Sequence, residues 1–189
     1  MSENIRNALK QQIIEQHGKL VYTFTTNEKE IQLLLKWKKR RQIISIILSA
    51  LTASPAVIKV FSNHTWWLYL SALAGFILLS LSSYSLSSDS DIKLAKLIEA
   101  THSLWLVRER YSSLLIDFDI LEIKKIQEIR DILTQETSEI YKKSPKTGKK
   151  AYKEAQKALQ IEEEQTFQNG EAENLLPTSL RKKEEYTHD

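Results

Sequence analysis

QIISIILSALTASPAVIKVF (residues 42–61) and WWLYLSALAGFILLSLSSYSL (residues 66–86) are two long apolar stretches of this 189-residue chain, and only a short polar segment separates them. A helix of about 20 residues rises about 30 Å, the thickness of the hydrocarbon core of a bilayer. Lys59 is the only charged residue in the two stretches, and it lies near enough to the end of the first for its ammonium to reach the interface. The sequence therefore predicts an all-α membrane protein whose transmembrane helices, at 42–61 and 66–87, form a hairpin around a loop at 62–65.

Aromatic residues mark both ends of the second stretch. Trp66, Trp67 and Tyr69 stand at its start and Tyr84 stands near its end, and such rings favour the headgroup layer of a membrane. A secretory signal fits poorly, because the long and mostly polar segment 1–41 precedes the first stretch. Two buried helices of a soluble core are the alternative to a membrane hairpin.

A basic cluster abuts the first stretch, and it consists of Lys36, Lys38, Lys39, Arg40 and Arg41. The loop between the stretches has no Lys or Arg, so the positive-inside rule places both termini on the cytoplasmic side. The cluster is then expected to lie at the anionic headgroups of the lipid bilayer. No nucleic-acid partner is expected, because the membrane boundary already explains the cluster and no aromatic stacking platform accompanies it.

Small and hydroxylated residues recur along one side of each stretch. They are Ser45, Ser49 and Thr52 in the first, and Ser71, Gly75, Ser82 and Ser85 in the second. Such stripes serve close helix packing, or they line a water-filled pore after oligomerisation, because one two-helix hairpin cannot enclose a channel. Pro55 removes a backbone hydrogen bond and predicts a kink in the first helix, which is either a static bend or a gating hinge.

The arms on both sides of the hairpin are predicted to be helical and cytoplasmic. Residues 1–41 contain two short amphipathic segments, which separate near Gly18 or around 25–27. Residues 88–143 are predicted to form one long helix with an apolar seam, whose partner is either the N-terminal arm or another subunit. The seam consists of Leu97, Leu104, Val107, Tyr111, Leu114, Phe118 and Leu121. A proline and glycine break then opens a C-terminal helical segment, 144–182, and a tail, 183–189.

Nothing in the composition supports catalysis or a cofactor. The chain has no cysteine, which excludes thiolate chemistry and disulfides. Its four histidines are scattered, without a second histidine or an acidic residue at the spacing of metal ligands. Its four glycines form no phosphate-binding loop. A non-enzymatic protein without a metal site is therefore expected.

The order of elements resembles the SLATT domains, which are bacterial two-transmembrane effectors associated with nucleotide-signalling conflict systems. The resemblance covers most of the chain. It rests on IISIILSALTAS (43–54), LWLVRERYSSLLIDF (104–118), EIRDILTQETSEIYKKSPKTGKKAYKEAQKAL (128–159) and EEQTFQNGEAENLLPTSLRK (163–182). The pattern around Trp105, Tyr111, Leu115 and Asp117 is its most specific part.

This resemblance implies a membrane effector of a bacterial anti-phage system, located in the inner membrane. Such an effector would oligomerise, form a pore or disrupt the membrane, and kill or arrest the infected cell. A nucleotide second messenger, or the synthetase system that makes it, is the implied partner. The chain has no recognisable nucleotide-sensing domain, so its trigger stays open. The alternative is a membrane-anchored helical scaffold that recruits a cytoplasmic partner.

Overall fold

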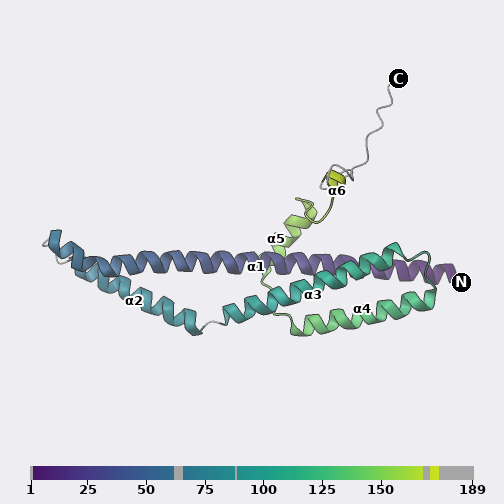
Figure 1. Cartoon of the computed structure of the whole chain (residues 1–189), viewed down its shortest axis with the longest axis horizontal. Coiled ribbons are helices and arrows are strands. Elements are labelled where there is room, and N and C mark those ends of the chain that lie inside the picture. Colours follow the sequence, from purple (N-terminus) through teal and green to yellow (C-terminus); the bar gives the residue numbers. More distant parts are fainter. Residues whose placement is uncertain (1, 62–65, 88, 168–170, 175–189) are drawn as a thin grey trace, which may run out of the picture.

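The computed structural model describes residues 2–61, 66–87, 89–167 and 171–174, and every regular element within them is a helix (Figure 1). The helices are α1 (Ser2–Phe61), α2 (Trp66–Ser87), α3 (Ser90–Ile116), α4 (Ile123–Lys143), α5 (Lys149–Gln160) and α6 (Glu171–Asn174). The all-α prediction is confirmed. The predicted loop at 62–65 and the predicted tail at 183–189 lie outside the described residues.

Helix α1 is one continuous helix, and at 1.5 Å per residue it is about 90 Å long (Figure 1). The prediction of two short helices before a separate membrane helix is wrong, because α1 passes through Gly18, through residues 25–27 and through position 41 without a break. The helix also continues through Pro55, and the predicted kink there stays a prediction.

Two local features explain why α1 is not interrupted. The hydroxyls of Thr25 and Thr26 donate to the carbonyl oxygens of Val21 and Tyr22, at 2.9 and 2.8 Å, so they bond within the helix instead of starting a turn. Gly18 costs a helix about 1 kcal/mol relative to alanine. Tertiary packing on both sides of that glycine outweighs this cost, because α1 buries apolar side chains before and after it.

The predicted long helix over 88–143 is wrong, because the chain turns after Ile116 and runs back as α4 (Figure 1). Arg6 of α1 holds this turn, since its guanidinium donates to the carbonyl oxygens of Phe118 and Leu121, both at 2.8 Å. Phe118 is buried beneath it, with the Arg6 guanidinium 5.6 Å from the ring centroid. Arg6, which is distant in sequence, therefore stabilises a turn that the apolar seam does not predict.

The apolar core lies between the first part of α1 and the α3–α4 pair (Figure 1). Its buried residues are Leu9, Ile13 and Leu20 of α1, Leu104, Val107, Tyr111, Leu114 and Phe118 of α3 and its turn, and Ile126 and Leu133 of α4. Burial of each such side chain stabilises the fold by about 1.5–3 kcal/mol. Helix α2 instead packs along the far part of α1, away from this core.

Helix α5 docks on the middle of α1 through small side chains. Ala151, Ala155 and Ala158 are fully buried. The chain after α5 then turns through Glu163 and Gln165, both at positive φ, and the carboxylate of Glu164 between them pairs with Lys29 of α1 at 2.8 Å. The short side chains let the two helix backbones approach closely, so α5 adds a fourth helix to the three of the core.

Among the described residues, no helix combines the length and the mean hydropathy of a membrane span. The membrane assignment of 42–61 and 66–87 therefore stays a prediction.

Candidate functional site

The interface between α1 and α2 is close at one point. Ala74 is buried there, and a Cβ added at Gly75 would lie 3.2 Å from Cγ2 of Thr52. Ser45 and Ser71 are half-buried on the two helices, as expected for residues at or near the contact. The stripe residues Ser45, Thr52, Ser71 and Gly75 thus lie where small side chains let the backbones approach.

Other residues of the predicted stripes face outward. Ser49 and Ser82 are exposed, and the side chain of Ser85 lies outside the described residues. The Ser49 hydroxyl donates to the carbonyl oxygen of Ser45 at 2.8 Å, which leaves its lone pairs available to another donor. The structure therefore divides each stripe into a packing part and an outward part, and a role in lining a pore stays a prediction.

The outer surface of the hairpin is apolar over a long distance. Among the described residues, its exposed large side chains are Ile43, Ile44, Ile46, Ile47 and Leu51 of α1, and Trp66, Tyr69, Leu73, Phe76, Ile77, Leu79 and Tyr84 of α2. Large apolar side chains exposed along two packed helices mark a region that lipid or another protein covers. This surface is the principal candidate for function.

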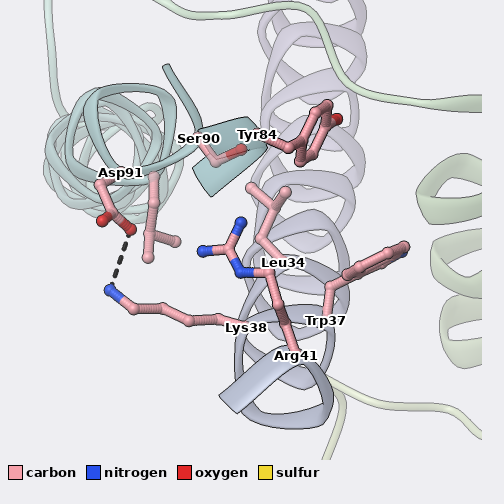
Figure 2. Close-up of a pocket in the computed structure, with 8 residues that line it drawn as sticks. Leu34, Trp37, Lys38, Arg41, Tyr84, Ser90 and Asp91 are labelled. Atoms are coloured by element: carbon pink, nitrogen blue, oxygen red, sulfur yellow. Dashed lines mark hydrogen bonds and ion pairs between the residues drawn. The ribbon is translucent and has the colours of Figure 1, made fainter. Parts of the chain in front are cut away.

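The basic cluster at the base of the hairpin divides between two faces of α1. Figure 2 shows Lys38 reaching toward Asp91 while the ring of Trp37 points the opposite way. Lys38 Nζ lies 2.9 Å from Asp91 Oδ1, and this hydrogen bond lowers the pKa of the Asp91 carboxyl. Arg41 lines the same cavity, of about 220 Å³, at the junction of α1, α2 and α3 (Figure 2). Part of the cluster thus anchors α3.

The residues of the predicted seam face the interior of this chain. Six of them are buried in α3 and the turn after it: Leu97, Leu104, Val107, Tyr111, Leu114 and Phe118. Leu121 is only partly buried, at the edge of the same core. All of these residues except Leu97 belong to the core that α3 shares with α1 and α4, and Leu97 is itself buried, so the seam is not a free surface.

Glu30 joins three helices, and sequence reasoning gave it no role. Its carboxylate accepts from Lys93 Nζ of α3 at 2.7 Å and from the backbone N–H of Gly148, the N-cap of α5, at 3.1 Å. The side chain is 10% exposed, so both bonds are largely shielded from water. No sequence pattern marks this residue, because its partners lie far away in the chain and glutamates are common on charged helices.

A polar patch lies beside Glu30 on α1. Thr25, Thr26 and Asn27 are buried with it, and the Nδ2 of Asn27 has no hydrogen-bond partner among the described residues. Unpaired buried amides cost roughly 1–3 kcal/mol. The unpaired Asn27 amide therefore costs stability at this point of α1.

The described residues contain no group of three or more His, Cys, Asp or Glu side chains that could hold a metal ion. His17 of α1 contacts α3 within the bundle. Its Nε2 lies 3.1 Å from Ser112 Oγ, and burial, followed by the nearby Arg108 charge, lowers its pKa. This is the environment of a packed side chain within the bundle.

These features define a class of protein: an all-helical chain in which one long helix connects a packed helical bundle to an apolar hairpin. Residues 9–171 match the family described as SMODS and SLOG-associating 2TM effector domain family 4, and the chain belongs to this SLATT family. The predicted family is confirmed. It is an effector family rather than a catalytic one, is associated with nucleotide-signalling defence systems, and its two-transmembrane character suggests membrane association. No curated protein and no solved structure matches the chain.

Proposed function

We propose that this chain is a membrane effector of a bacterial nucleotide-signalling anti-phage system. The α1–α2 hairpin lies in the inner membrane, and both termini lie in the cytoplasm. Several copies assemble and form a pore or disrupt the membrane, which kills or arrests the cell. The apolar outer surface of the hairpin is the observation that carries this proposal.

Solvation of that surface favours lipid over water. Eleven large hydrophobic side chains among the described residues from Ile43 to Leu79 are exposed, and covering them contributes on the order of 10 kcal/mol. The cationic cluster 36–41 stands at one end of the surface, where anionic headgroups would meet it. Apolar side chains beside a cationic boundary are the arrangement that a bilayer stabilises.

Assembly is needed for a pore because one two-helix hairpin cannot enclose a channel. The Gly75–Thr52 approach closes the interface inside one hairpin. The exposed hydroxyls of Ser49 and Ser82 lie on the outer surface of the hairpin, where another copy could meet them. In this proposal they face the aqueous path, while the surrounding isoleucines and leucines face lipid or neighbouring hairpins.

The bundle of α1, α3, α4 and α5 receives the signal in this proposal. A nucleotide second messenger, or a protein of the system that makes it, would act on the bundle, and α1 would transmit the change. The support is structural: α1 is unbroken from the core residue Leu9 to the hairpin, so a shift at one end moves the other.

The test is inducible expression of the whole chain in bacteria, with and without the cognate signal, while a potential-sensitive dye reports the membrane potential. We expect depolarisation with the signal, and we expect Ser49→Trp to change its extent. Gly18→Leu is the matched control, because it adds a large side chain to the same helix where nothing lies within 4 Å. Intact membrane potential under every condition would contradict the proposal.

A scaffold is the second candidate, and one observation favours it. Ile98, Trp105 and Leu106 of α3 are exposed, and a groove of about 590 Å³ between Phe24 and Trp105 lies beside them. Because the predicted seam is buried, a recruited partner would use an exposed face such as this one. Replacement of the hairpin by an unrelated transmembrane hairpin would preserve a scaffold's function and abolish a pore.

A further inference from the structure

A groove lies between α1 and α5 on the face of α1 opposite the one that Lys38 presents to Asp91. Lys36, Trp37, Arg40 and Ile44 line it from α1, since residues three and four apart share a face of a helix. Lys150, in the first turn of α5, lines it from the other side. The groove has a volume of about 840 Å³. Two segments that are far apart in sequence thus converge on one site.

The groove carries an excess of positive charge. Its acidic and basic residues near the α1–α5 contact are already paired, because Lys29 binds Glu164 at 2.8 Å and Glu30 binds Lys93. Lys36, Arg40 and Lys150 form no ion pair within the described part of the chain. Glu154 is the remaining carboxylate of the lining. These three cationic side chains are therefore available to bind an anion.

An apolar edge continues from these cations to the hairpin. Trp37 is 65% exposed and Ile44 is 48% exposed. Ile44 also belongs to the apolar outer surface of the hairpin, so the groove opens onto that surface. A ligand that fits both parts combines an anionic group with hydrocarbon. The guanidinium of Arg40 and the ammonium groups of the two lysines suit phosphate oxygens.

We propose that this groove binds the headgroup phosphate of an anionic phospholipid, whose acyl chains lie against Ile44 and the hairpin. The inference rests on the proposed membrane insertion of the hairpin. It adds a specific lipid site to that proposal, because the bound lipid bridges α1 and α5 and so links the docking of α5 to the membrane. Continuity with the apolar surface favours a lipid over a soluble phosphate.

The test uses the purified full chain in mild detergent, titrated with phosphatidylglycerol or phosphatidylcholine, with retained lipid counted by native mass spectrometry. We expect preferential retention of phosphatidylglycerol. Lys150→Gln and Arg40→Gln should each weaken retention about fivefold, as expected for one basic residue at a headgroup. Lys153→Gln is the matched control, because this exposed lysine of α5 does not line the groove. Circular dichroism verifies that each variant is folded.

Three outcomes would overturn the inference: equal retention of the two lipids, equal effects of Lys150→Gln and Lys153→Gln, or displacement of phosphatidylglycerol by millimolar inorganic phosphate. The last would identify a site for soluble anions. Alkaline extraction of bacterial membranes distinguishes a failure of the lipid site from a failure of the proposed function. A chain that resists extraction but shows no selective lipid contradicts only the groove, whereas an extracted chain contradicts the membrane hairpin.

Discussion

The two halves of α1 have the same backbone and opposite surroundings. In residues 2–31, Leu9, Ile13 and Leu20 are buried against α3 and α4. In residues 32–61, no described side chain is fully buried, and isoleucines such as Ile46 face outward. The backbone is therefore helical both where its apolar side chains are buried by protein and where they are exposed. The first half builds a core, and the second presents a surface.

The comparison also shows where the two halves meet. Around Glu30 the packing changes from apolar to small and polar, and Thr25, Thr26 and Asn27 are buried there. Beyond it begins the basic cluster. Helix α1 is continuous across this polar junction. The following variants test the contrast, in order of expected effect.

The largest effect is expected from Ile13→Ala set against Ile46→Ala. Ile13 is 0% exposed and Ile46 is 68% exposed, so the same truncation probes both halves of one helix. Ile13→Ala should lower the free energy of unfolding by about 2–5 kcal/mol, because it leaves a cavity in the core. Ile46→Ala should change it by less than about 0.5 kcal/mol. Chemical unfolding in detergent measures both, and equal losses would remove the contrast.

Glu30→Ala probes the junction itself. It leaves Lys93 and the Gly148 amide without their shared acceptor, and we expect a loss of about 1–3 kcal/mol. Hydrogen exchange should show faster exchange in the first turn of α5. Glu15→Ala is the control, because its ion pair with Lys19 is exposed and contributes at most about 1 kcal/mol. Unchanged protection of α5 in Glu30→Ala would show that Glu30 does not hold that helix.

Gly75→Leu tests how close the two hairpin helices must be. Its side chain would enter the contact with Thr52 and should destabilise the hairpin by about 1–3 kcal/mol. Gly18→Leu, in the open part of α1, should instead stabilise the protein by up to about 1 kcal/mol, because leucine favours a helix. Thermal unfolding of the two variants should therefore shift in opposite directions, and shifts in the same direction would contradict the close contact.

The smallest effect is expected from the titration of His17. Burial lowers its pKa in the folded chain, so the folded state disfavours the imidazolium. The stability that the neutral ring contributes is complete above the unfolded pKa of about 6.5, and it is lost as the pH falls through the folded value. His17→Gln should flatten the stability profile below pH 6.5. An unchanged profile would assign the pH dependence to other groups.

Local patterns in the sequence predicted much of this molecule. Apolar spacing identified the helical class, the hairpin segments and the seam residues that α3 buries, since these depend on periodicity that each segment carries alone. The same patterns failed at Gly18 and at 25–27, where a helix breaker and hydroxyls are tolerated because packing and bonds within the helix outweigh them. They failed again after Ile116, where a distant Arg6 stabilises a turn.

The sequence by itself determined the apolar stretches, the basic cluster beside them and the family resemblance, because composition and spacing are properties of neighbours along the chain. Only the tertiary structure decided that the basic cluster lies on two faces of α1, with Lys38 held by Asp91 and Arg40 lining the groove that Lys150 also lines. It also decided that Glu30 joins α1, α3 and α5. Such contacts depend on the relative placement of separate helices, and that placement follows from the packing of the whole chain.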